Sequence, residues 1–301
     1  MKVLSLINLF FLLLLTTGVW GQNSYDYNRR QEEEFLRREQ EEIDRRARTA
    51  VPNPFRFVPG TRYETRIINT VRAFPGSIKL TESDKKLAAP EAELNAKYLE
   101  FLKQPKTGLL KLLEASCFEE QNTGRACAGN GLPAYGSAYS FRRNEYQMQE
   151  WADLWLNDDF FIADVLFGQG WLVALGDVEI ENLSLQTKGA DFLDSMTPKD
   201  TRALAETQYQ QSVQGINENK LFYRKFVRVR ENTAYVLRSV AYRGKFVRYD
   251  GNTTKTDMTK GDTRDDVIIA FRVIKKDSAG NVTIVWKELS RKVAPLIDLK
   301  K

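Results

Sequence analysis

Apolar and polar residues alternate with a period of two over much of the C-terminal half of the chain. Because successive side chains of a strand point to opposite faces, this pattern predicts half-buried strands. The clearest runs lie at 221–230, 233–242, 245–249, 266–275 and 282–289. Short apolar runs between 151 and 185, and an alternating run from 61 to 73 that ends at Pro75-Gly76, predict further strands.

A period near 3.6 predicts helices at about 90–103, 107–116 and 197–215. Thr107 is the expected N-cap of the second helix. In the third, Thr197 and Asp200 form a capping box and Gly215 ends the helix. These helices and strands do not alternate regularly, and no internal repeat is present. The sequence therefore predicts an α+β domain at 61–301, a mainly antiparallel β-sheet with helices packed on one side.

Charged residues dominate the segment 22–50. Acidic residues precede arginines by four positions, as in Glu33–Arg37 and Glu41–Arg45, an arrangement that stabilises an exposed helix. The apolar stripe is narrow, so we interpret the segment as a charged, solvent-exposed spacer helix. The alternative is a helix that docks on a partner or on a second copy. Three prolines within 51–60 predict a linker before the folded domain.

Residues 1–21 are typical of a secretory signal. Lys2 precedes an apolar run, Val3 to Leu15, that is too short to span a bilayer, and small residues lead up to Gln22. We expect cleavage before Gln22 and an extracytoplasmic mature chain, secreted or periplasmic, with no transmembrane segment. A retained membrane anchor is the alternative.

Export suggests how the chain uses its cysteines. Cys117 and Cys127 are the only two, and in an oxidising compartment they most simply form a disulfide with each other. Chain entropy gives such a bridge about 2.5–3 kcal/mol of stabilisation. Free thiols are the alternative, since the spacing fits neither a redox pair nor a zinc site. The nearby Gly129–Ala134 has the letters of a dinucleotide-binding turn, but no apolar strand precedes it.

Composition excludes several kinds of chemistry. The chain contains no histidine, which removes Ser-His-Asp and Cys-His catalysis and histidine-ligated metals. The formal net charge of +5 is only mildly basic, and 42% hydrophobic residues suffice for a packed core. We expect no cofactor and no resident metal. The segment 250–257 has oxygen donors at alternate positions but lacks the glutamate and glycine of an EF-hand.

One acidic, tryptophan-rich segment invites an enzymatic interpretation. Paired carboxylates beside aromatic rings are what glycoside hydrolysis requires. Most of these acids nevertheless lie at turns, where aspartate is common for backbone reasons. The residues concerned are Asp153, Asp158, Asp159, Asp164, Asp177 and Glu179, with Trp151, Trp155 and Trp171. A carboxylate-dependent glycan hydrolase is therefore an alternative, and an enzyme is the less favoured class.

The functional hypothesis rests on the strands at 221–250. If Glu231-Asn232 and Arg243-Gly244 are two-residue hairpin turns, Arg228 lies opposite Tyr235, and Arg224 opposite Ser239. One sheet face then carries valines, and the other carries basic and aromatic side chains. The candidate ligand-binding residues are Arg224, Arg228, Arg230, Arg248 and Tyr235. This register has one flaw, because it places Lys225 against Arg238 on the core face.

We therefore expect an exported, non-catalytic protein of binding or structural type. A face of arginines and aromatic rings suits an anionic polysaccharide, a lipid head group or an acidic protein, and does not favour nucleic acid in an exported chain. The simplest alternative is an ordinary solvated sheet face. A structural spacer built around the charged helix is a third possibility.

Overall fold

The computed structural model divides the chain into two units, Met1–Val51 and Pro52–Lys301, and every residue described below belongs to the second. The described residues are 74, 76, 80, 82–114, 136–157, 159–250 and 254–297. The predicted charged helix, the strand expected at 61–73, Cys117 and Cys127 all lie outside these ranges.

A large antiparallel sheet of five strands forms the centre of this unit. Its strand order is β1 (Thr107–Leu112), β14 (Val282–Val293), β13 (Asp265–Lys276), β10 (Ala234–Ala241) and β6 (Gly168–Gly176). Every residue of β10 is buried. Its side chains alternate between two apolar environments, with Tyr235 and Leu237 on one face and Val236 and Val240 on the other. Both faces of the large sheet are therefore covered.

A smaller sheet covers one of these faces. Its strand order is β3 (Glu145–Tyr146), β2 (Ala138–Ser140), β4 (Leu154–Asn157), β5 (Phe160–Ile162) and β9 (Phe226–Arg228). The main core lies between the two sheets, where the Phe161 ring meets Tyr235 and Phe271 edge-on, with centroids 5.5 and 5.2 Å apart. The sheets are also joined at their margins, by a bridge between Leu172 and Arg224 and by the Tyr146 hydroxyl, which donates to the Lys111 carbonyl.

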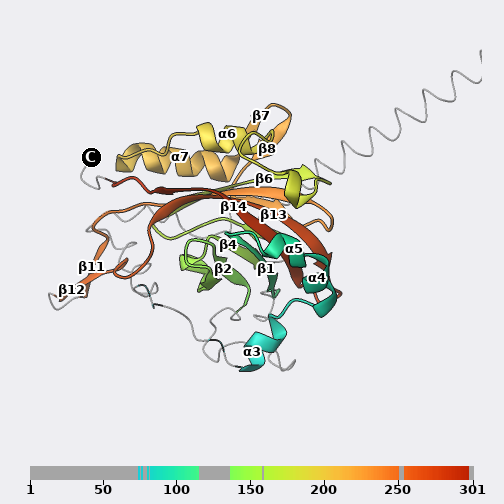
Figure 1. The fold of residues 1–301 in the computed structure, drawn as a ribbon. Coiled ribbons are helices and arrows are strands. Elements are labelled where there is room, and N and C mark those ends of the chain that lie inside the picture. Colours follow the sequence, from blue (N-terminus) through green and yellow to red (C-terminus); the bar gives the residue numbers. More distant parts are fainter. Residues whose placement is uncertain are drawn as a thin grey trace, which may run out of the picture. The chain divides into compact units, whose positions relative to one another are not determined.

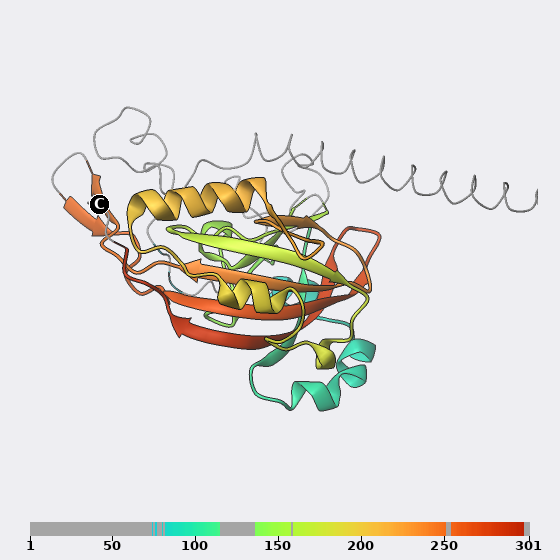
Figure 2. The ribbon, with the colours of Figure 1, turned by 90° about the horizontal axis from the view of Figure 1, so that it is seen from above.

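Helices cover the opposite face of the large sheet. Figure 1 shows α6 (Ala190–Ser195) and α7 (Arg202–Gln214) on one side of it and the strands of the small sheet on the other. In Figure 2, α6 and α7 lie across the sheet, and α4 (Ala92–Lys97) and α5 (Leu99–Leu102) lie beside its other end. Tyr98 and Phe101 pack there against Ala270 and Val285.

The remaining elements are short. Helix α3 (Glu82–Leu87) precedes α4, and the 3₁₀ turns η2 (Gln149–Trp151) and η3 (Ile180–Asn182) lie in connections. Two small hairpins complete the unit, β7 (Ile216–Glu218) with β8 (Leu221–Tyr223), and β11 (Val247–Asp250) with β12 (Thr254–Asp257). None of the helices in the described ranges has the length and apolar character needed to cross a membrane.

The expected class agrees with these residues, since antiparallel sheets dominate and α-helices pack against them. The expectation of a sheet with helices packed on one side was incomplete, because a second, smaller sheet covers the other side of the large sheet. The strands expected at 233–242, 245–249, 266–275 and 282–289 are present as β10, β11, β13 and β14. The strand expected at 221–230 is present as the shorter β8 and β9.

The prediction of a helix at 107–116 was also wrong for those of its residues that the structure describes. Residues 107–112 form β1, where Leu110 and Leu112 enter the core between the sheets and Leu109 packs toward the helices. Because Leu109 and Leu110 are both apolar and neighbours in the sequence, the segment lacks strict alternation, and periodicity alone does not separate so short an apolar run from a helix. The Thr107 hydroxyl donates to the Gln104 carbonyl at 2.8 Å, just after the end of α5. It therefore does not cap the start of a helix.

The helix predicted at 197–215 begins later than expected. Helix α7 starts at Arg202 after Thr201, and it ends before Gly215 as predicted. The Gln208 side chain donates to the Thr197 carbonyl at 3.2 Å and accepts from the Lys199 amide at 3.2 Å. These bonds hold the preceding segment alongside the helix, so its residues are not available as a capping box.

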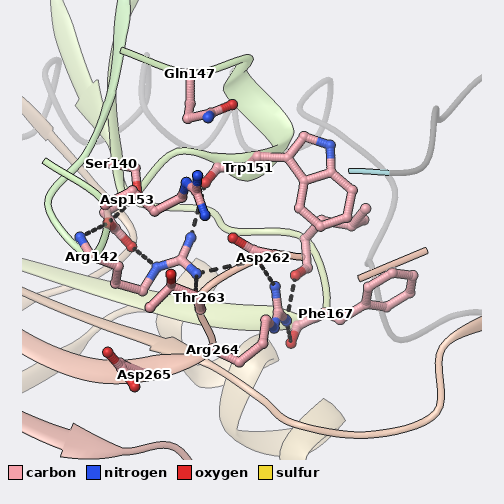
Figure 3. Close-up of polar contacts among 12 residues, drawn as sticks. Ser140, Arg142, Gln147, Trp151, Asp153, Phe167, Asp262, Thr263, Arg264 and Asp265 are labelled. Atoms are coloured by element: carbon pink, nitrogen blue, oxygen red, sulfur yellow. Dashed lines mark hydrogen bonds and ion pairs between the residues drawn. The ribbon is translucent and has the colours of Figure 1, made fainter. Parts of the chain in front are cut away.

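A buried ion network connects the two sheets and the loop before β13 (Figure 3). The Asp153 carboxylate, with no exposed surface, accepts hydrogen bonds from Arg142 Nε (2.6 Å) and the Arg142 amide (3.0 Å), and from the hydroxyls of Ser140 (3.1 Å) and Ser239 (2.6 Å). Since Ser140 belongs to β2 and Ser239 to β10, one carboxylate holds both sheets together.

The same guanidinium extends the network toward the loop. Arg142 donates to the Trp151 carbonyl at 2.9 Å, to the Thr263 carbonyl and to Asp262, which lies 2.8 Å from Arg264. Burial opposes the charge on Arg142, but the two aspartates outweigh it and raise its pKa. Burial, together with repulsion from Arg142, lowers the pKa of Arg264 to about 10. Both arginines are therefore held by acids and backbone carbonyls.

We predict that Asp153→Asn lowers the free energy of unfolding by roughly 3–5 kcal/mol, because Arg142 loses the closer of its two carboxylate partners while it stays buried. Urea denaturation monitored by circular dichroism measures the change, with the slope m checked for constancy. Asp159→Asn is the matched control: Asp159 pairs with Lys276 at a partly exposed site, where the expected cost is below about 1 kcal/mol. Equal losses in the two variants would contradict a special role for Asp153.

A second prediction concerns the buried phenols. Burial raises the pKa of Tyr223 to about 12 and raises the pKa values of Tyr139, Tyr146, Tyr209 and Tyr242 further above 10. Because the unfolded phenols ionise near pH 10, the protonated forms favour the folded state, and this contribution is lost as pH rises above 10. Tyrosinate absorbance should show a group of tyrosines that ionises only together with unfolding. Ionisation of all tyrosines near pH 10 in a folded chain would refute this.

Candidate functional site

The outer face of the small sheet carries aromatic, aliphatic and arginine side chains. Trp155 of β4 is paired with Ile162 of β5, which is paired with Phe226 of β9, and in the next row Phe160 is paired with Arg228. Residues directly opposite one another share a face. Their sequence neighbours, such as Leu156 and Val227, point into the core between the sheets. We call this side of the small sheet the aromatic–arginine face: Trp155, Phe160, Ile162, Arg224, Phe226 and Arg228. Phe160, Arg224 and Phe226 are buried, and Trp155, Ile162 and Arg228 are partly exposed.

Arg224 lies at one end of this face. Its guanidinium is stacked over Phe222 and Phe226, at 4.7 and 5.1 Å from the ring centroids, so that ring faces stabilise the charge. The residue is buried, and its backbone pairs with Leu172 of the large sheet. Arg224 therefore fixes the path of the chain between the two sheets as well as contributing charge.

Arg228 differs from Arg224 in its surroundings. It is half-buried, and its side chain forms no hydrogen bond or ion pair within the described ranges. Asp159, which directly precedes Phe160, is already paired with Lys276 at 2.7 Å. A guanidinium that has lost part of its hydration, and that has no acid as a partner among the described residues, is well placed to bind an external anion.

The backbone of β9 is anchored from the large sheet. The Tyr235 hydroxyl donates to the Arg228 carbonyl at 3.0 Å and accepts from the Arg230 amide at 2.8 Å. The Tyr235 ring is fully buried and stacks on Phe271. Tyr235 is thus a core residue that holds the end of β9 in place, and its side chain is not on the predicted surface.

The predicted hairpin register was wrong. Strand β9 pairs with β5, β10 pairs with β6 and β13, and β11 pairs with β12. Arg230 is exposed beyond the end of β9, and Arg248 pairs through its backbone with Thr256. The alternation within 221–230 was nevertheless informative, since Arg224, Phe226 and Arg228 do share a face opposite Val227. Strand β10 (Ala234–Ala241) is buried over its whole length, so its neighbouring strands must be about as long as it is. Strand β9 (Phe226–Arg228) is too short to be one of them.

The like-charge contact in that register is also resolved. Lys225 pairs with Asp164 at 2.6 Å, while Arg238 forms a two-bond ion pair with Asp266 at 2.9 and 2.6 Å. Arg238 also donates to the Leu193 and Met196 carbonyls at the end of α6. Each cation has its own carboxylate, so the two do not meet.

The acids of the tryptophan-rich segment are all occupied in the part of the chain that is described. Asp153 binds Arg142, Asp159 binds Lys276, Asp164 binds Lys225, and Asp177 and Glu179 both bind Arg272. Asp158 is outside that part. Glycoside hydrolysis needs two carboxylates on either side of one bond, and acids that are already paired with cations do not favour it. Within the same ranges, no group of three or more acidic side chains is arranged to hold a metal ion.

Phe160 and Ile162 of the aromatic–arginine face were not selected from the sequence, and Trp155 was considered only as part of the acidic, tryptophan-rich segment. Their strands lie about sixty residues before β9, and nothing local shows that β5 and β9 are neighbours. One signal was present, because LWLN places Leu154 and Leu156 on one face and Trp155 on the other.

Comparison with known proteins adds no relative from which a role could be carried over. No protein-family model matches the chain, and neither the curated proteins nor the solved structures contain a significant match.

Proposed function

We propose that the protein is an exported, non-catalytic binding protein, and that its aromatic–arginine face binds an acidic polysaccharide. The observation that carries the proposal is Arg228, a half-buried guanidinium without a carboxylate partner in the described ranges. It lies on the same face as the partly exposed Trp155 and the buried rings of Phe160 and Phe226. No catalytic residue is assigned.

The chemistry of this face suits a sugar acid. Sugar rings present flat C–H surfaces that pack on aromatic rings, and a guanidinium binds a carboxylate or sulfate through two parallel hydrogen bonds. A lipid head group shares the anionic group but not the ring. An acidic protein shares the carboxylates but not the sugar ring. The binding experiment must therefore distinguish a polysaccharide from a lipid head group and from an acidic protein.

Export supports this choice of ligand. In the proposed organisation, residues 1–21 are removed as a signal, 22–50 form a charged helical segment, 51–60 are a linker and 61–301 form the binding domain. A chain outside the cytoplasm meets acidic polysaccharides of an envelope or matrix. Cys117 and Cys127 would be joined there as a disulfide.

The decisive measurement is retention of the mature chain on immobilised heparin across a salt gradient. Arg228→Ala should weaken binding about ten-fold or more, because a charge-assisted hydrogen bond is lost, and should therefore elute at lower salt. Arg228→Lys should be intermediate, since an ammonium group lacks the bidentate geometry.

The matched control is Lys260→Ala, which removes the same charge from an exposed residue between β12 and β13. It should elute with the wild type. If the wild type and the three variants elute at the same salt concentration, the aromatic–arginine face is an ordinary sheet face and the proposal is wrong. Binding to phosphatidylserine vesicles without binding to heparin would identify a lipid instead of a polysaccharide.

Export itself has a direct test. Expressed with its own N-terminus in a secreting host, the chain should be recovered outside the cytoplasm with Gln22 as its first residue. Thiol titration of the unfolded, unreduced protein should detect no free cysteine. A full-length cytoplasmic product, or two reactive thiols in the exported protein, would contradict the proposed compartment.

A further inference from the structure

Helix α7 packs on the large sheet through an unusually polar face. Its buried residues are Ala205, Gln208, Tyr209 and Ser212, while its one leucine, Leu204, is about half exposed. Helices of similar length normally depend on a stripe of large apolar residues for their stability. The attachment of α7 must therefore come mainly from polar contacts.

Those contacts converge on Lys225. Its ammonium donates to the Tyr209 hydroxyl at 2.7 Å and to Asp164 at 2.6 Å, and its backbone amide donates to the Ser212 carbonyl at 2.7 Å. A second contact joins Gln169 of β6 to Gln208 at 2.7 Å. Burial and the Asp164 charge raise the pKa of Tyr209, so its hydroxyl stays protonated and lies 3.4 Å from Asp164 as a donor.

Two buried hydrogen-bond acceptors beneath α7 lack a donor among the described residues. Lys225 and Asp164 are almost fully buried, yet within the described ranges Oδ1 of Asp164 has no hydrogen-bond partner, and neither has Oε1 of the buried Gln169. A buried acceptor without a donor carries an uncompensated desolvation cost. Contact with water or with another donor would remove this cost, so the closed position of α7 is less favourable than its contacts suggest.

The sheets beneath are held quite differently. Strands β10 and β13 are buried on both faces by large apolar residues, whereas α7 places only Ala205 and Tyr209 in a hydrophobic cluster, with Val213 partly buried beside them. Local stability follows buried apolar contact. We infer that α7 opens as a unit while both sheets remain folded, and that its opening exposes the buried Lys225–Asp164 pair. The inference is independent of polysaccharide binding.

Native-state hydrogen exchange of the full mature chain, read by mass spectrometry at low denaturant, tests the inference. Peptides from α7 should exchange at least about ten-fold faster than peptides from β10 and β13. Tyr209→Phe removes the hydroxyl that Lys225 contacts. It should increase exchange in α7 by a further two- to ten-fold, roughly the effect of one hydrogen bond, and leave the ratio between β10 and β13 unchanged.

Tyr139→Phe is the matched control, because it deletes a phenol that bonds Asn144 far along the chain from α7. It should leave α7 at its wild-type rate relative to β10. If α7, β10 and β13 exchange at one common rate, the helix opens only with global unfolding and the inference fails. It also fails if Tyr209→Phe accelerates every peptide equally, since the hydroxyl would then stabilise the whole domain.

Discussion

The carboxylate of Asp153 is the point on which both sheets depend. It fills its hydrogen-bonding capacity with donors from β2, from the turn that follows β2 and from β10, so a charge in the interior is fully compensated. The Arg142 guanidinium then carries the connection to Asp262 and to the loop before β13. Apolar packing between two sheets tolerates small sliding movements, whereas these directional bonds fix how β2 and β10 face one another.

Charges elsewhere in the interior follow the same arrangement. Lys225 with Asp164 and Arg238 with Asp266 are further buried pairs, each with additional hydrogen bonds to a helix of the covering layer. Such pairs contribute little net stability compared with well-packed apolar residues, but breaking one is costly. They specify which helix lies over which strand. In the same way, each described acid of the tryptophan-rich segment is paired with a cation. Arg228 is the contrasting case, because it has no carboxylate partner among the described residues.

Sequence reasoning recovered what local pattern determines and missed what distant segments determine. The positions of β10, β13 and β14 followed from alternation, and the end of α7 followed from Gly215. The pairing of β9 with β5 did not follow, because register between distant strands depends on competition among all possible partners. The like-charge contact of Lys225 with Arg238 was a sign that the simple hairpin was incorrect. For β1, Leu109 is apolar and partly buried beside the buried Leu110, so the alternation that would have distinguished a strand from a helix was lost.

The side chain of Tyr235 has a further consequence for how this molecule behaves in a crowded solution. A strand at the margin of a sheet offers unpaired amides and carbonyls to which another chain can add, the first step of many aggregates. On β9 the Arg228 carbonyl and the Arg230 amide are already bonded to the Tyr235 hydroxyl. A phenol from the core thereby occupies two backbone groups at this end of the margin, so an added strand could not form hydrogen bonds with them.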